Sequence, residues 1–298
     1  MSLRSILHVF GGESHELNAL SSALALARAS QAHVRILHIA APPILPDSLG
    51  IGSYAVAAYG GDATIVDVLE KDARQLSDQA TGYVADYCRR EDIPLLEEGA
   101  PNALGHAYAT FRVVTGIHET CLAHEAYATD LVVSAYNNRP AGDLQTALTA
   151  LFSADRPILL LPRVPGEPLG AGGFARNLVF AWDGSRAAAQ ALREAVPHMR
   201  HAEQVSLLRV GRDDHFADVV AESDACVYLR DHGISPQCVL ADRKGRKIGD
   251  ALLQEAAVLK ADLLAMGAYG HGHFGEMLLG GATSHVLKHG RLPLLLAR

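Results

Sequence analysis

Three glycines near the end of the chain have the spacing of a phosphate-binding loop. Gly267, Gly270 and Gly280 follow an apolar, strand-like run at residues 262–265 and lead into a helical pattern of apolar residues. Glycines allow backbone N–H groups to turn inward around an anion, and the N-terminus of the following helix adds its dipole. The stretch therefore predicts a strand, a glycine-rich turn and a helix that together bind a phosphate group.

Two other phosphate loops fit this stretch less well. Gly270, Gly272 and Gly275 match the G-x-G-x-x-G fingerprint of dinucleotide sites, which needs a further strand and an acidic residue about 20 positions on. Only 23 residues follow Gly275, and position 295 is a leucine. A Walker A loop needs Gly-Lys-Ser or Gly-Lys-Thr, which does not follow.

A second candidate contact is Asp183, in the run Ala181-Trp182-Asp183-Gly184-Ser185. A carboxylate accepts hydrogen bonds from amino or hydroxyl donors, so Asp183 could hold a ligand. It could equally cap the following helix, with Gly184 and Ser185 supplying turn chemistry. The residues alone leave both interpretations open.

The spacing Gly267-x2-Gly270-x9-Gly280 resembles the nucleotide loop of the universal stress protein family, whose pattern is G-x2-G-x9-G-[ST]. The Asp183-Gly184-Ser185 run matches that family's Asp-Gly-Ser, whose aspartate recognises adenine or ribose. Gly281 stands where the family has Ser or Thr, so one hydroxyl donor to phosphate is lost while the backbone N–H remains.

This resemblance implies an adenine-nucleotide site in the second half of the chain, for ATP, ADP or AMP, with Mg²⁺ possible alongside the phosphates. The implied contacts are Ala181, Asp183, Val210, Met266, Gly267, Gly270, His271, Gly280, Gly281, Ala282 and Thr283. Val210 is nearly as well explained as a core strand residue, and His271 as an exposed loop residue. No nucleophile elbow, catalytic triad or paired catalytic carboxylate is recognisable, so we expect at most slow ATP hydrolysis.

Alternating strand and helix patterns position these residues. Strands are expected at residues 5–10, 33–39, 108–115, 130–135, 157–161, 177–182, 205–210, 237–241, 262–265 and 293–297. Helices are expected at residues 16–29, 67–90, 117–127, 144–152, 187–196, 215–231, 248–259 and 278–287. Such alternation favours α/β architecture with parallel strands and helices on both faces of each sheet.

The two halves of the chain resemble each other. Asp130-Leu131-Val132-Val133 matches Asp262-Leu263-Leu264-Ala265, and residues 156–163 match residues 291–298, a repeat with a period of about 140 residues. The pattern is similar to a tandem pair of universal stress protein domains. This implies two doubly wound, five-stranded sheets packed as a pseudo-dimer through antiparallel pairing of residues 157–161 with residues 293–297. The expected divisions are a domain at 1–163, a linker at 164–176 and a domain at 177–298.

The first half lacks both nucleotide loops. Its first turn, Phe10-Gly11-Gly12-Glu13-Ser14, contains no aspartate. Residues 136–142 lack the glycine spacing, and Pro140 among them has no N–H to donate. We therefore expect nucleotide binding in the second half only.

Composition limits the remaining functions. A net charge of −7 argues against unspecific binding to nucleic acid. Residues 1–10 lack a signal-peptide pattern, no run approaches 18 apolar residues, and the four cysteines are scattered. We expect a cytoplasmic stress-response protein, a homodimer with an unidentified protein partner, in which nucleotide acts as a signal. The alternative is a nucleotide-free scaffold of the same fold.

Two further clusters have plain alternatives. His118, Cys121 and His124 could offer ligands to zinc, but their spacing drifts by about 60° around a helix, and 15 histidines make chance clusters common. The basic run Arg243-Lys244-Gly245-Arg246-Lys247 could attract a polyphosphate, or it could be an ordinary solvated loop.

Overall fold

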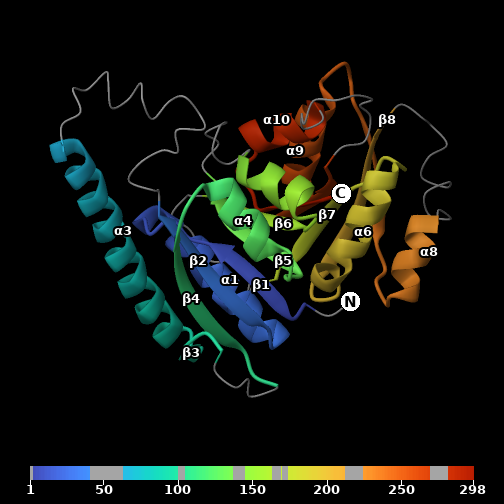
Figure 1. Cartoon of the computed structure of the whole chain (residues 1–298). Helices are drawn as coiled ribbons and strands as arrows, with labels where there is room; N and C mark the ends of the chain where they lie inside the picture. Colours follow the sequence, from blue (N-terminus) through green and yellow to red (C-terminus); the bar gives the residue numbers. More distant parts are fainter. Residues whose placement is uncertain are drawn as a thin grey trace.

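The computed structural model describes residues 3–40, 63–99, 105–136, 145–162, 169, 174–211, 224–268 and 281–298, without the side chains of residues 63–67 and 69. Within these residues, eleven strands form a single sheet in the order β3-β4-β2-β1-β5-β6-β11-β10-β7-β8-β9. Figure 1 shows the first half of the chain and the second half side by side along this sheet.

The elements alternate between strand and helix through both halves. Those of the first half are β1 (Ser5–Val9), η1 (Ser14–Glu16), α1 (Leu17–Ser30), β2 (His33–Ala40), α3 (Ala63–Arg90), β3 (Leu95–Leu96), β4 (Tyr108–Thr115), α4 (His118–Ala126), β5 (Leu131–Tyr136), the π-helix η3 (Thr149–Ser153) and β6 (Ile158–Pro162). Those of the second half are β7 (Asn177–Ala181), α6 (Arg186–Met199), β8 (Gln204–Gly211), α8 (Asp224–Asp231), β9 (Gln237–Asp242), α9 (Ile248–Val258), β10 (Leu263–Gly267), α10 (Gly281–His289) and β11 (Leu294–Ala297).

The two halves have equivalent strand orders on the two sides of the β6–β11 pair. The order β4-β2-β1-β5-β6 in the first half corresponds to β9-β8-β7-β10-β11 in the second. Strands within each half run parallel, whereas β6 and β11 pair antiparallel, with Leu159 opposite Leu295. The predicted pairing of residues 157–161 with residues 293–297 is confirmed, and it joins the two predicted sheets into one.

Helices cover both faces of the sheet. Helices α1, α3, α6 and α8 contribute to the hydrophobic core on one face, and α4, η3, α9 and α10 contribute to the core on the other. Central strands such as β5, β6 and β11 are almost fully buried. Burial on both faces explains why they consist of continuous apolar runs rather than alternating patterns.

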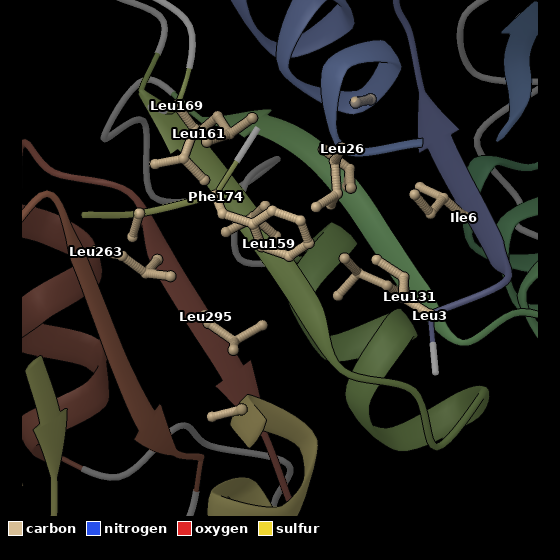
Figure 2. Close-up of a cluster of buried hydrophobic side chains, with 14 of the residues drawn as sticks. Leu3, Ile6, Leu26, Leu131, Leu159, Leu161, Leu169, Phe174, Leu263 and Leu295 are labelled. Atoms are coloured by element: carbon tan, nitrogen blue, oxygen red, sulfur yellow. The ribbon is translucent and has the colours of Figure 1, made fainter. Parts of the chain in front are cut away.

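Described parts of the expected linker pack onto the junction between the halves. Leu169 and Phe174 are buried, and Figure 2 shows them on the same side of the sheet as Leu161 and Leu159. The Leu169 N–H donates to Ser22 Oγ on α1 at 3.0 Å. The segment between the halves is therefore attached to the first half at residue 169.

Most predicted elements are observed, with shifts at their ends. α3 begins at Ala63, four residues before its predicted start, and α6 continues to Met199, three residues past its predicted end. The two-residue edge strand β3 was not predicted, because only its pairing with β4 makes it a strand. Residues 215–223 and 278–280 of two predicted helices lie outside the described residues.

Three histidines, His8, His38 and His198, are buried among the described residues, and the pKa of two of them is lowered. His8 Nδ1 lies 3.1 Å from the Val133 carbonyl oxygen. Burial, partly offset by this hydrogen bond, lowers the pKa of His8 from 6.5 to about 4. Burial, reinforced by the charge of neighbouring His201, lowers the pKa of His198 to about 4.

These pKa values predict that acid destabilises the protein before its carboxylates are protonated. Between pH 6.5 and 4, these two histidines bind protons in the unfolded chain but stay neutral in the folded protein. The free energy of unfolding therefore falls as pH falls. Each histidine accounts for on the order of 3 kcal/mol across that window. Urea unfolding from pH 7 to 4.5 should show a shallower pH slope for His8→Gln than for the native chain.

The same substitution at the exposed His124 is the control for losing one ionisable group. An unchanged pH slope in a folded His8→Gln variant would contradict the assignment of His8 as a neutral core residue.

Candidate functional site

The candidate site lies where the strand order of the second half reverses. β7 and β10 are neighbours, and Met266 pairs with Ala181 at their carboxyl ends. On the other side of β7 lies β8, and on the other side of β10 lies β11. Ligands of open α/β sheets bind beyond the carboxyl ends of the strands at such a reversal. The fold therefore brings the carboxyl ends of β7 and β10 together.

A hydrogen-bonded turn presents Asp183 at this edge. The Trp182 N–H donates to the Leu208 carbonyl oxygen at 2.8 Å, which keeps the chain in the sheet as far as Trp182. The Ser185 N–H then donates to Asp183 Oδ1 at 2.9 Å, and Gly184 takes a φ of +76°. Asp183 itself is exposed.

The helix cap is Ser185 rather than Asp183. Ser185 Oγ accepts from the Ala188 N–H at 3.1 Å at the start of α6. Asp183 forms the preceding turn, in which a side-chain oxygen bonds to the backbone two residues on. A carboxylate has about four acceptor positions, so this one hydrogen bond leaves capacity to accept from a ligand.

Gly267 has a packing role at the same place. A Cβ at this position would lie 2.8 Å from the Ala187 carbonyl carbon and from the Ala188 nitrogen. The absence of a side chain thus allows the end of β10 to touch the first turn of α6. This contact holds the end of β10 against the start of α6, next to the turn that carries Asp183.

Some of the other predicted contacts lie within the described residues, and some lie outside them. Met266 is buried, and Ala181 and Val210 are half-buried at the ends of β7 and β8. Gly281, Ala282 and Thr283 form the first turn of α10, in which Gly281 is exposed and Thr283 is buried. No described atom lies within 4 Å of the position of a Cβ on Gly281. Gly270, His271 and Gly280 lie outside the described residues.

The equivalent turn of the first half has a similar backbone conformation but different residues. The Phe10 N–H donates to the Leu37 carbonyl oxygen, as Trp182 does to Leu208. Strand register then places Gly11 at the position of Asp183, and Gly12, with a φ of +89°, at that of Gly184.

Side chains of the first half fill its own turn. The Gly11 N–H donates to Glu16 Oε2 at 2.6 Å, and Glu16 is 5% exposed. A Cβ on Gly12 would lie 2.9 Å from the Leu76 carbonyl oxygen and 3.2 Å from Ala80 Cβ, both on α3. No sequence pattern marks Glu16 as a contact of this turn, because it directly precedes the apolar helix α1 and is typical of a helix start. Glu16 places a carboxyl group where the second half leaves its turn exposed.

Two other sequence clusters show ordinary roles. His118 Nε2 lies 3.3 Å from Thr146 Oγ1, and burial lowers the pKa of His118. In the described part of the chain, no three metal-ligating side chains gather into a group that could hold a metal ion. In the basic run, Arg246 donates to the carbonyl oxygens of Arg243 and Asp242 and so shapes its own loop.

Comparison with known proteins shows a family likeness for the second half. Residues 175–298 match the model of the universal stress protein family. The second half is therefore similar to a universal stress protein domain. The match includes Asp183, β10 and α10, the parts from which the candidate site is built. No curated protein matches the chain.

Solved structures show that the likeness to the universal stress protein fold also includes the first half. A universal stress protein from Archaeoglobus fulgidus aligns with a TM-score of 0.66 at 12% identity, over 99% of this chain and 96% of that one. A functionally unknown protein from Pseudomonas aeruginosa aligns with a TM-score of 0.60 at 15% identity, over 99% and 92%. The chain therefore shares its fold, over both halves, with each of these two proteins. No helix in the described ranges has the length and apolarity needed to cross a bilayer.

The contact at Gly267 yields a stability prediction. Gly267→Ala should lower the free energy of unfolding by about 1–3 kcal/mol, because its Cβ would overlap backbone atoms that cannot rotate away. Gly82→Ala is the matched control: Gly82 lies in α3 with no atom within 4 Å of its Cβ position. That change should stabilise by about 0.5–1 kcal/mol through helix propensity. Equal effects of the two changes in urea unfolding would contradict the close approach at Gly267.

Proposed function

We propose that the second half of the chain binds one adenine nucleotide, ATP or AMP, and uses it as a regulatory signal rather than a substrate for rapid turnover. One observation carries the proposal. Asp183 is held exposed beside Gly267 at the strand-order reversal, whereas the equivalent turn of the first half is filled by Glu16. The proposal includes a cytoplasmic stress-response role, a homodimer and a protein partner that reads the bound state.

Each group has a physical task in this proposal. Asp183 accepts hydrogen bonds from the adenine amino group or from ribose hydroxyls. The half-buried side chains of Val210 and Ala181 supply apolar surface for the base. Phosphates, with Mg²⁺ accompanying them, lie toward the glycine loop and the N-terminus of α10, where backbone N–H groups and the helix dipole favour anions. Bound nucleotide would then favour one conformation of the domain over another.

Removing the Asp183 carboxylate should separate recognition of the nucleoside from recognition of phosphate. Asp183→Ala should weaken ATP and AMP binding about tenfold, the equivalent of about 1.4 kcal/mol, and leave inorganic triphosphate binding unchanged. Titration calorimetry should also give one nucleotide per native chain.

Asp242→Ala is a matched control for this experiment. Asp242 Oδ1 accepts from the Lys244 N–H at 2.8 Å in the same kind of turn, two strands away at the end of β9. If both variants bind like the native chain, Asp183 is a turn residue only. If the native chain binds no nucleotide and releases none on denaturation, the scaffold interpretation replaces the proposal.

Since no described atom lies near the Cβ position of Gly281, this residue allows a gain-of-function test. Gly281→Ser should tighten ATP binding several-fold, because a hydroxyl would add a hydrogen bond to phosphate, worth about 1 kcal/mol. Gly281→Ala raises helix propensity without adding a donor, so it controls for stabilisation of α10. Equal affinities in the two variants would show that position 281 does not face the phosphates.

A further inference from the structure

Two thiols outside the candidate site touch each other at one edge of the sheet. Cys226 Sγ on α8 lies 3.0 Å from Cys238 Sγ on β9, and neither cysteine forms a disulfide. Disulfide sulfurs are about 2.05 Å apart, so a movement of about 1 Å would bring these two to bonding distance.

A tight turn holds the two cysteines together. α8 ends with three backbone hydrogen bonds, from His232 and Ile234 to the Leu229 carbonyl oxygen and from Gly233 to that of Arg230. Gly233 takes the positive φ of +77° that this ending requires. Cys238 is then fixed by the pairing of β9 with β8, opposite Leu207. No rearrangement of the domain is needed to bring the thiols into contact.

The two thiols differ in their access to solvent. Cys226, on α8, is fully buried, while Cys238 is partly exposed on β9, the outermost strand on that side of the sheet. We expect a small solute to reach Cys238 more readily than Cys226, which is then the neighbour that can react with the product. The remaining cysteines, Cys88 and Cys121, contact no other sulfur among the described residues.

We propose that Cys226 and Cys238 are an oxidative modification site, at which a peroxide closes an intramolecular disulfide between α8 and β9. The Cys238 thiolate attacks one peroxide oxygen, the O–O bond breaks, and hydroxide leaves to become water. The Cys226 sulfur then attacks the sulfenic acid of Cys238, the S–O bond breaks, and the second hydroxide leaves as water. One peroxide accepts two electrons, and two thiols become one disulfide.

The environment of Cys238 makes this reaction demanding. Burial and the neighbouring Cys226 thiol raise the pKa of Cys238 to about 12. Because the thiolate is the reactive form, only a small fraction reacts at neutral pH, and the rate should rise about tenfold per pH unit below the pKa. The site therefore responds to a heavy or sustained oxidant load rather than to traces.

Mass spectrometry of the reduced full-length chain treated with hydrogen peroxide tests the proposal. The expected product is lighter by two hydrogen atoms and returns to its starting mass with dithiothreitol. Trypsin cleaves after Arg212, Arg230 and Arg243, so Cys226 and Cys238 fall on peptides 213–230 and 231–243. Those peptides should remain joined before reduction, and their yield at fixed time should increase from pH 7 to pH 9.

Variants separate this pair from general thiol oxidation. Cys226→Ser and Cys238→Ser should each abolish the joined peptides, while Cys121→Ser should keep them. Differential alkylation of the native chain gives the same answer if a serine variant fails to fold. Joined peptides 213–230 and 231–243 support the proposal. Oxygen addition at Cys238 without a crosslink, or crosslinks only between chains, would overturn it.

Discussion

The antiparallel hydrogen bonding between β6 and β11 determines the arrangement of the whole molecule. All other described strand pairs are parallel, so this one reversal points the strands of the two halves in opposite directions. The carboxyl ends of β1 and β5 therefore lie at one edge of the sheet, and those of β7 and β10 lie at the opposite edge. A ligand bound at the carboxyl ends of the strands of one half cannot also contact those of the other half, so each half must build its site from its own loops.

The two halves use the same turn in opposite ways. Both turns continue the sheet through one backbone hydrogen bond and then use a glycine with positive φ. In the second half the acidic side chain is Asp183, exposed in the turn itself. In the first half it is Glu16, which reaches back from the helix into the turn and is buried there. A buried carboxyl group that accepts a backbone N–H stabilises the fold, and it fills the turn that the second half leaves exposed.

Periodicity was sufficient to predict the order of the major strands and helices, because nearly every element has an apolar face or is apolar throughout. The repeated runs at residues 157–161 and 293–297 were sufficient to predict their pairing. The candidate contacts at Asp183 and Gly267 lie at adjacent strand ends as expected. The glycine spacing could not reveal that Gly267 is required by the first turn of α6, since that contact joins residues 80 positions apart.

Other features depend on turn geometry and packing that leave no recognisable sequence pattern. Glu16 looks like an ordinary residue at a helix start, and only the folded turn shows that it accepts from the Gly11 N–H and is buried. Ser185 and Asp183 are both good capping residues, and only the turn geometry decides which of them caps α6. Cys226 and Cys238 are 12 positions apart without a recognised motif, and the ending of α8 at Gly233 brings them into contact.

The β6–β11 pair also has a consequence for biosynthesis. About 130 residues separate Pro162 from Leu294, so a ribosome working at roughly 5–20 residues per second needs roughly 7–26 s to make the partner strand. Throughout that interval the nascent first half carries β6 as an apolar sheet edge, which is a template for pairing with other chains. Neighbouring nascent chains on one messenger would present the same edge at the same stage. Misassembly is therefore most favoured in the interval before β11 is made, and slower translation of the second half would lengthen that interval.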